Sequence, residues 1–298
     1  MQQPNQWLAR IADLSPETAI EISDIFEALE ESVVNTPLAA AAFCAGEDAD
    51  WAVEANFAEK PDPAWIEGLV SDFKTNHGIA PSIQIEEMEN RDWVSLSLQN
   101  LSPVKAGRFF VHGSHDREKP MSGSISIEID AGQAFGTGHH ATTSGCLAAL
   151  DRELRHTNFR NCMDLGCGSG VLAIAFAKAT KQPVLATDID PVALEVARQN
   201  VKLNRTAREV TCIVADGLEN PTVRQSAPFD LVMANILSAP LISLANAMRR
   251  CVAPGGILIL SGILARQAPK VEASYRAAGF HFKHRSINEN WATLILRR

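Results

Sequence analysis

Several features are missing from this sequence, and each absence narrows the range of functions. The 298-residue chain has no positive charge excess: its formal net charge is −8 at pH 7. This argues against a general nucleic-acid-binding protein, which would normally be basic, but suits a basic protein partner. No stretch approaches the length of a membrane-spanning helix, and the first residues lack the basic start and apolar run of a signal peptide. The sequence therefore predicts a cytoplasmic protein with no membrane contact and no direct nucleic-acid readout.

A metal centre is also not expected. The chain has six cysteines, none in a Cys-x-x-Cys pair: Cys44, Cys146, Cys162, Cys167, Cys212 and Cys251. Without such a pair a zinc site is improbable, and the scatter is typical of buried thiols in a reducing compartment. His139 and His140 are adjacent in the chain, and adjacent residues rarely converge on one ion without further ligands nearby.

Strand and helix patterns alternate after residue 124, which is typical of a doubly wound parallel sheet. Five strands are expected, at 161–165, 183–188, 210–215, 229–234 and 256–261. Helices are expected between them, at 171–180, 191–204 and 239–250. Two final strands, 280–286 and 291–296, are joined by too few residues for a crossover helix, so they must pair antiparallel. A parallel sheet that ends in an antiparallel hairpin favours a methyltransferase-type sheet over a nicotinamide-binding one.

The N-terminal part reads as a small α+β domain with two helices against an antiparallel sheet. Its strands are expected at 7–12, 50–58 and 83–87, and its helices at 18–30 and 63–76. Ser15 is a good helix cap, with Pro16 at the first helical position. We expect three parts: a substrate-recognition domain over 1–88, a linker helix over 89–101, and a catalytic domain over 102–298.

The segment CMDLGCGSG, residues 162–170, is the strongest functional signal. An apolar strand runs into Asp164, and a glycine-rich turn with Gly166, Gly168 and Gly170 leads to a helix. Glycine lets a ligand approach bare backbone. The spacing G-x-G-x-G is one residue short of the dinucleotide pattern, and a carboxylate before the first glycine suits a ligand with a cationic amino-acid end. S-adenosylmethionine is such a ligand. The alternative is a glycine turn with no ligand role, which any α/β protein can contain.

Two acidic residues follow the next two expected strands. Asp188 ends the second strand, where a carboxylate can accept both ribose hydroxyls of a bound adenosine. It could instead cap a helix, but Asp190 before Pro191 is the better cap. Asp216 follows the third strand, near the expected position of an adenine amine, and is equally well explained as a helix cap.

Asn235 ends the fourth strand, and the carboxyl ends of parallel strands line the ligand crevice. Its amide oxygen could orient a nucleophilic amine. The residues after it are Ile, Leu and Ser, unlike the proline-rich and aromatic sequence of the adenine and glutamine methyltransferases. Upstream, the glycine-rich loop 131–140 precedes a helix that opens with Thr142 and Thr143, and this loop could fold over a cofactor.

Together these motifs resemble the ribosomal protein L11 methyltransferases of bacteria, the PrmA family. The family loop reads AFGTG and then Thr-His-Pro-Thr-Thr; here AFGTG is followed by HHATT, so His139 and Ala141 depart from the pattern. The glycine motif, TDIDP, ANIL and GGILILSGIL occur in family order. The resemblance covers about the last two thirds of the chain specifically, and the N-terminal part agrees only in size and pattern.

The resemblance implies an α/β fold: a class I, Rossmann-like, seven-stranded methyltransferase domain after a ferredoxin-like N-terminal domain. It implies a protein N-methyltransferase that uses S-adenosylmethionine and acts on lysine side chains and the α-amino group of ribosomal protein L11. Cofactor ligands carry over to Thr143, Gly166, Asp188 and Asn235, and His140 matches the loop histidine. From their motif positions, Gly168 and Asp216 join the expected cofactor contacts. Asn235 and His140 are the catalytic candidates.

Three alternatives remain open at this stage. A lysine methyltransferase for another protein would share these motifs. An NAD-dependent oxidoreductase is disfavoured by the glycine spacing, the terminal hairpin and the lack of an acid/base set for hydride transfer. A non-catalytic, ribosome-associated module that merely holds the cofactor is disfavoured by Asn235 and the loop. No side chain stands out as a general base, so positioning and desolvation of the amine are expected to dominate catalysis.

Overall fold

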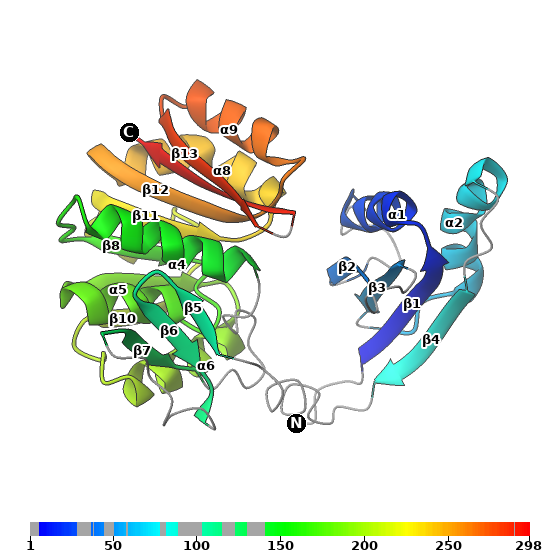
Figure 1. The fold of residues 1–298 in the computed structure, drawn as a ribbon, viewed down its shortest axis with the longest axis horizontal. Helices are drawn as coiled ribbons and strands as arrows, with labels where there is room; N and C mark the ends of the chain where they lie inside the picture. Colours follow the sequence, from blue (N-terminus) through cyan, green and yellow to red (C-terminus); the bar gives the residue numbers. More distant parts are fainter. Residues whose placement is uncertain are drawn as a thin grey trace. The chain divides into compact units, whose positions relative to one another are not determined.

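The computed structural model describes residues 6–28, 37, 39–44, 51–57, 59–77, 82–88, 103–114, 123–129, 141–288 and 290–298. Contacts within the chain divide it into two units, Met1–Asp92 and Trp93–Arg298, and each has its own hydrophobic core (Figure 1). The expected linker helix lies outside the described residues. In the part of the chain that the structure describes, no helix has the length and apolar character needed to span a membrane.

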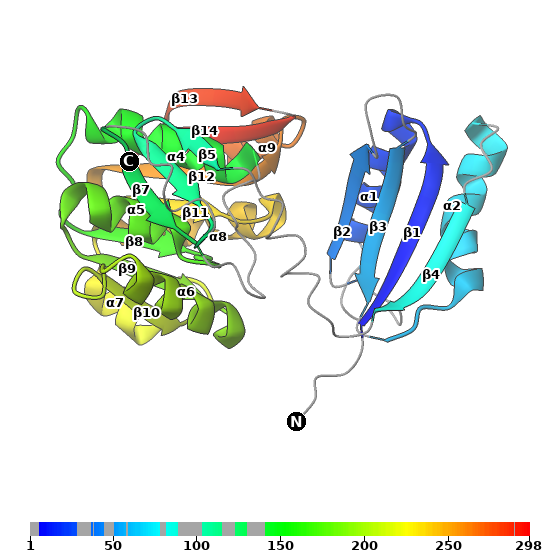
Figure 2. The ribbon, with the colours of Figure 1, turned by 60° about the horizontal axis from the view of Figure 1, so that its bottom comes forward.

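The N-terminal unit has the β-α-β-β-α-β order of a ferredoxin-like domain. Its elements are β1 (Gln6–Leu14), α1 (Pro16–Ala28), β2 (Ala39–Cys44), β3 (Trp51–Phe57), α2 (Pro63–His77) and β4 (Ser82–Met88). The strands pair antiparallel in the order β2-β3-β1-β4. Figure 2 shows both helices on one face of this sheet. The ferredoxin-like prediction is therefore confirmed.

Alternating side chains build the core of this unit. Ile11 and Val53 face each other in the β1–β3 register, both are fully buried, and both join Phe26 of α1 in one cluster. The cap at Ser15 is confirmed, because its Oγ accepts the backbone N–H of Thr18 at 3.2 Å. Helix α1 begins at Pro16, directly after this cap. Strand β2 was not predicted, since its sequence AAAAFC has no polar–apolar alternation.

The second unit is built on a seven-stranded sheet. Its strands are β8 (Cys162–Leu165), β9 (Val184–Asp188), β10 (Val210–Val214), β11 (Phe229–Asn235), β12 (Val252–Leu264), β13 (His281–Asn288) and β14 (Trp291–Arg297). Their order is β10-β9-β8-β11-β12-β14-β13. The first five are parallel, whereas β14 pairs antiparallel with both β12 and β13. This confirms the α/β methyltransferase-type sheet with its terminal hairpin.

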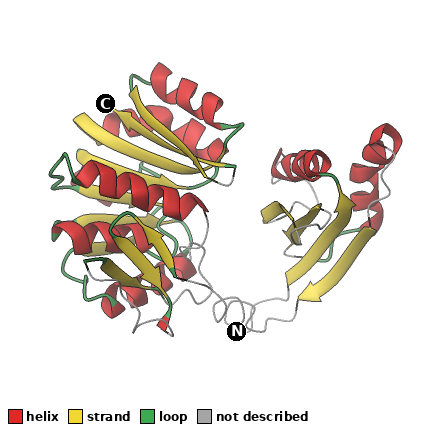
Figure 3. Ribbon diagram, viewed as in Figure 1, coloured by secondary structure: helices red, strands yellow, loops and turns green. Residues whose placement is uncertain are grey.

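Helices cover both faces of this sheet (Figure 3). They are α4 (Ala141–Leu154), α5 (Val171–Thr180), α6 (Pro191–Leu203), α7 (Pro221–Ser226), α8 (Ser238–Cys251) and α9 (Ala268–Ala277). The central strand β11 alternates between two cores: Met233 packs with α4, α5 and α6, while its neighbour Val232 packs with α7, α8 and α9. Both faces of the strand are therefore buried, as a doubly wound sheet requires.

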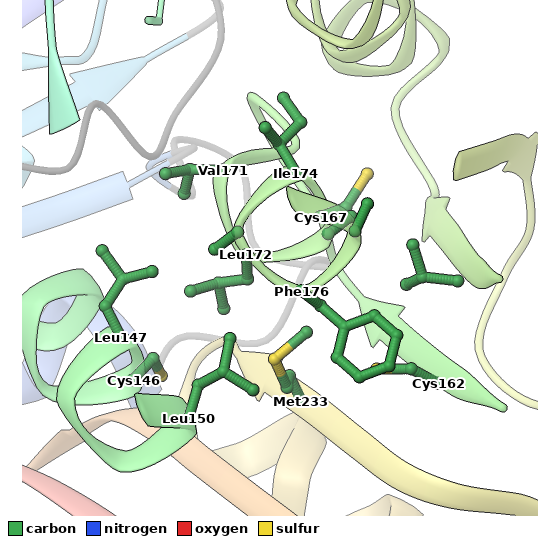
Figure 4. Packing of buried hydrophobic residues seen from close by; sticks show 14 of the residues in the cluster. Cys146, Leu147, Leu150, Cys162, Cys167, Val171, Leu172, Ile174, Phe176 and Met233 are labelled. Carbon is green, nitrogen blue, oxygen red and sulfur yellow. The ribbon is translucent and has the colours of Figure 1, made fainter. Parts of the chain in front are cut away.

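The first of these cores lies around α5 (Figure 4). Leu147 and Leu150 of α4, Phe176 of α5 and Met233 of β11 are completely buried there. Because α5 reads VLAIAFAKAT and is buried over most of its surface, it is a core helix rather than an amphipathic one. The tightly packed side chains around α5 consequently hold in place the glycine turn that precedes it.

A three-stranded sheet was not predicted. It consists of β5 (Val104–Ala106), β6 (Phe109–His112) and β7 (Ile125–Glu128), and its apolar residues join the core around α4 and α5. Arg108 at its turn pairs with the nearly buried Asp151 of α4 at 2.5 Å. Strands of three or four residues are too short to give a period-two signal, so the sequence pattern did not reveal them.

Candidate active site

The candidate site lies at the carboxyl ends of β8, β9, β10 and β11. In the strand order β10-β9-β8-β11, chain progression reverses between β8 and β11, since β9 follows β8 on one side and β11 lies on the other. Open α/β sheets bind ligands outside the strand ends at such a switch point. The glycine turn follows β8 and therefore lies at the centre of this edge.

Three left-handed residues shape the glycine turn. Gly166, Gly168 and Gly170 have φ angles of 68°, 51° and 81°, which residues with a side chain rarely adopt. A Cβ on Gly170 would lie 3.2 Å from the Cβ of Ala197, so this glycine also lets α5 pack closely on α6. As predicted, α5 begins directly after the turn, at Val171.

Asp188 is tied to the glycine turn. One carboxylate oxygen accepts the backbone N–H of Gly168 at 2.8 Å, and the other accepts that of Asp190 at 3.0 Å. Asp190 itself caps α6, since its Oδ1 accepts the N–H of Val192 at 2.8 Å. The structure thus assigns the helix cap to Asp190, as expected. Each oxygen of Asp188 accepts one hydrogen bond from the described residues, which leaves a further lone pair on each for another donor.

Asp164 is a buried carboxyl with an incomplete set of partners. Only 1% of its surface is exposed. Oδ2 accepts the N–H of Ala173 at 2.9 Å, whereas Oδ1 is buried and meets no partner among the described residues. Burial raises the pKa of Asp164 from 3.8 to about 7, and the negative charge of Asp188 acts in the same direction. A buried oxygen without a donor is costly, so this site favours a donor group supplied from outside.

Asn235 and Thr143 meet although 92 positions separate them in the chain. The side-chain amide of Asn235 donates to Oγ1 of Thr143 at 3.3 Å. Thr143 lies in the first turn of α4 and is 1% exposed, while Asn235 is the last residue of β11. Nδ2 donates to Thr143, and Oδ1 has no hydrogen-bond partner among the described residues, so it can accept from an incoming N–H.

Gly145 explains why α4 reaches this position. A Cβ on Gly145 would come within 2.2 Å of the Thr293 hydroxyl on β14. That hydroxyl pairs with Ser261 of β12 at 3.1 Å. The helix therefore lies directly on the sheet at this point, which brings Thr143 to the end of β11.

Asp216 follows β10 and is exposed. The nearby helix α7 is capped by Asn220, whose Oδ1 accepts the N–H of Thr222 at 2.9 Å, so Asp216 does not cap that helix. Two apolar side chains are exposed beside it at the same edge: Ile189 is 66% exposed and Val214 is 47% exposed. Ile189 follows the end of β9 and Val214 ends the neighbouring β10, so the two strand ends that precede Asp216 carry exposed apolar residues.

Two histidines named in the sequence analysis lie outside the described part of the chain. His140, the second catalytic candidate, belongs to the loop 131–140 together with His139, so its role stays a prediction. Among the residues that are described, no group of three or more His, Cys, Asp or Glu side chains has the arrangement of a metal site.

Sequence reasoning missed the close packing around Ile236. A Cβ on Gly262 of β12 would meet the Ile236 backbone, and a Cβ on Gly166 would meet its side chain. A glycine inside a strand pattern often marks such a close backbone approach. This signal was present in the segment SGIL, where Gly262 has a φ of 79°.

Comparison with known proteins agrees with this geometry. The family model described as ribosomal protein L11 methyltransferase (PrmA) matches residues 15–298. A relative of that name from Bradyrhizobium diazoefficiens is 49% identical over 252 residues, which cover 84% of this chain and 85% of the relative. Another, from Mesorhizobium japonicum, is 45% identical over 278 residues, or 93% and 96% of the two chains.

A solved structure gives the same result. The crystal structure of a ribosomal protein L11 methylase from Lactobacillus delbrueckii subsp. bulgaricus is 27% identical, with a TM-score of 0.61. The match covers 66% of this chain and 99% of that one. The chain therefore belongs to the ribosomal protein L11 methyltransferase (PrmA) family, and S-adenosylmethionine is its methyl donor.

Proposed function

We propose that this protein methylates lysine side chains and the α-amino group of ribosomal protein L11. The observation that carries the proposal is the Asn235–Thr143 pair, an uncharged polar group at the strand end beside the glycine turn. The names of the relatives support ribosomal protein L11 as the substrate. An NAD-dependent oxidoreductase receives no support, because the chain belongs to a methyltransferase family.

The contacts at the strand ends suggest how the cofactor is held. The lone pairs left on Asp188 can accept the two ribose hydroxyls. The apolar side chains of Ile189 and Val214 can cover the adenine, with Asp216 close enough to accept from its amine. The glycine turn places Gly166 and Gly168, which are both partly exposed, at the same strand end. His140, in the loop before α4, would act near the methionine end of the cofactor.

Asp164 fits the cationic end of the same ligand. Its unpartnered Oδ1 needs a donor, and a pKa of about 7 means that the carboxyl is readily ionised by a nearby positive charge. The α-ammonium group of S-adenosylmethionine supplies both the donor and the charge. This fit separates the cofactor from a dinucleotide, whose pyrophosphate would be repelled by a carboxylate.

Asn235 and its surroundings suit an amine acceptor. When bound, the cofactor offers an electrophilic methyl group on a sulfonium. A lysine amine attacks only when neutral, and its pKa in water is about 10.4. A carboxylate at the position of Asn235 would favour the charged ammonium form. An uncharged amide oxygen accepts a hydrogen bond from the neutral amine and favours the ammonium form much less. Asn235 would thus orient the amine, while desolvation promotes loss of its proton.

Charge is divided unevenly along the chain. Residues 1–92 hold four Lys or Arg against nineteen Asp or Glu, a formal charge of −15, so the rest of the chain carries +7 of the total of −8. A ribosomal protein that binds RNA phosphates is rich in Lys and Arg. Electrostatic attraction of such a protein supports a substrate-recognition role for the N-terminal domain, residues 1–88.

The decisive experiment uses labelled S-adenosylmethionine, purified ribosomal protein L11 and, in parallel, a whole-cell extract. The full chain should label L11 in both mixtures. A chain that lacks residues 1–87 should keep its cofactor affinity but lose methylation of L11, because the acidic unit is gone. Labelling of a different extract protein would identify another substrate, and full activity of the shortened chain would contradict the division of labour.

Asp188→Ala should weaken S-adenosylmethionine binding about 10- to 100-fold, since a hydrogen bond to a charged group contributes roughly 1.5–3 kcal/mol. Calorimetric titration measures the affinity. Asp190→Ala is the matched control: it removes a carboxylate two residues away that only caps α6, so it should cost about 1 kcal/mol of stability and leave the affinity nearly unchanged. Equal affinities for the two variants would refute the role of Asp188.

Cofactor affinity should depend on pH through Asp164. In the free protein its pKa is about 7, and pairing with an ammonium would lower that pKa. Binding below pH 7 therefore releases a proton, and affinity should rise as pH increases through 7. It should decline again above about 8, where the α-amino group of the ligand loses its proton.

Calorimetry in two buffers with different ionisation enthalpies measures this proton release directly. The same pKa makes the ligand-free protein lose stability as pH rises between about 4 and 7, because the folded state binds more protons than the unfolded state over that range. Asp164→Asn should abolish the rise in affinity with pH. An affinity that stays constant from pH 5.5 to 7 in the wild-type protein would exclude the pairing.

Asn235→Ala should reduce turnover roughly 10- to 100-fold while cofactor affinity changes much less, because orientation of the amine matters most in the transition state. Asn235→Asp should be inactive at neutral pH and recover activity as pH rises, since its carboxylate stabilises the unreactive ammonium. Steady-state rates across pH provide the measurement. Wild-type turnover by both variants at pH 7 would make Asn235 a structural residue only.

A further inference from the structure

We propose that Gly166 and Gly262 form a clamp on Ile236 that positions Asn235 for the reaction. This inference rests on the proposed function and adds two positioning residues to it. Ile236 directly follows Asn235 and lies between the end of β11 and the start of α8. Its position therefore determines the orientation of Asn235 at the end of β11.

Strand pairing alone does not hold this segment. The β11–β12 register ends where Asn235 pairs with Ser261, and the next element, α8, begins at Ser238. Leu237 occupies the helix cap position without a side-chain cap hydrogen bond. The backbone of Ile236 consequently needs another source of order, and the two glycines provide it by close packing.

Gly262 supports the backbone of Ile236. It lies in β12 at a φ of 79°, where the pairing of β12 with β14 shifts register between Leu260 and Ile263. A Cβ at Gly262 would come within 2.4 Å of the Ile236 carbonyl oxygen, 2.8 Å of its carbon and 3.0 Å of its nitrogen. The peptide of Ile236 thus lies directly on bare backbone, and any side chain at Gly262 would displace it.

Gly166 contacts Ile236 from the cofactor turn. Its missing Cβ leaves a space that Cγ2 of Ile236 fills, because a Cβ there would lie 2.3 Å from that methyl group. The β-branch of isoleucine thereby links the glycine turn to the residue after Asn235. The cofactor turn and the amine-orienting amide are fixed to each other through one side chain.

The clamp predicts a loss of rate rather than of binding when it is disturbed. A shift of Ile236 by a fraction of an ångström moves Asn235 away from Thr143 and from the amine, and a misplacement of about 1 Å can cost on the order of 100-fold in rate. Neither the ribose carboxylate nor the N-terminal unit is touched. The expected signature is a lower kcat with nearly unchanged KM for the protein substrate, and a change in cofactor affinity much smaller than the change in kcat.

Gly262→Ala tests the clamp, and Gly255→Ala is its matched control. Both glycines belong to β12 and both have a φ of 79°, but a Cβ at Gly255 would meet only Arg297 at an ordinary 3.5 Å. The two variants share the strain of a left-handed alanine and differ in the clash with Ile236. Gly262→Ala should lower kcat about 10- to 100-fold relative to Gly255→Ala.

Ile236→Leu is the second variant, because it moves the branch away from Cβ and removes the methyl group that fills the space at Gly166. It should lower kcat about tenfold. It also decides the question if Gly262→Ala does not fold. Wild-type kcat for Ile236→Leu, or equal kcat for the two alanine variants, would overturn the clamp.

A second readout separates this inference from the proposed function. The side-chain amide signals of Asn235, recorded by NMR of ¹⁵N-labelled protein, should shift in Gly262→Ala or Ile236→Leu and not in Gly255→Ala. Unchanged signals in both clamp variants would overturn the inference whatever the substrate is. Failure of the wild-type chain to label any protein would refute the proposed function, and the NMR comparison would still decide whether the clamp orients Asn235.

Discussion

The left-handed backbone of the glycine turn is the constraint on which the other features of the site depend. Because Gly168 turns its N–H toward the end of β9, it can donate to Asp188 and fix that carboxylate. Because Gly170 has no side chain, α6 can approach α5 and carry its cap, Asp190, to the same edge. Gly166 leaves the space for Ile236 and so connects the turn to β11. One turn therefore sets the positions of the ends of β9 and β11 and of the start of α6.

Local signals in the sequence were sufficient for most of the fold and several contacts. The helix 171–180 and the hairpin at the end of the chain were predicted correctly because their apolar patterns and short connection leave few alternatives. The assignment of the cap to Asp190 followed from its place before proline. These features depend on neighbours in the chain, which the sequence displays directly.

Features that depend on distant packing were not visible. Strand β2 consists largely of alanines and is recognised only by its pairing with β3. The contact between Asn235 and Thr143 requires Gly145 to seat α4 on β14, a three-body arrangement that no local pattern expresses. Gly262 was part of a motif used for family resemblance, but its φ and its approach to Ile236 appear only when β11 and β12 are paired.

The distribution of charge along the chain bears on two steps of the proposed reaction, attraction of the substrate and loss of its proton. The lysine that we propose as the methylated group is an ammonium ion in water, so the acidic N-terminal unit can attract it, and residues 1–92 carry a formal charge of −15. The same positive charge must be absent when the amine attacks.

Negative charge at the reacting end of the sheet would therefore oppose catalysis. In our proposal the side chain that contacts the amine, Asn235, is uncharged, whereas the carboxylates of the site contact the cofactor. Asp188 is a carboxylate held by two backbone N–H groups at the end of β9, and Asp164 is a buried acid with its pKa raised to about 7. Pairing Asp164 with the ammonium of the cofactor would neutralise the buried carboxylate that ionises there. In this proposal attraction and deprotonation occur in different electrostatic surroundings, which would let the enzyme act on a basic protein without a dedicated general base.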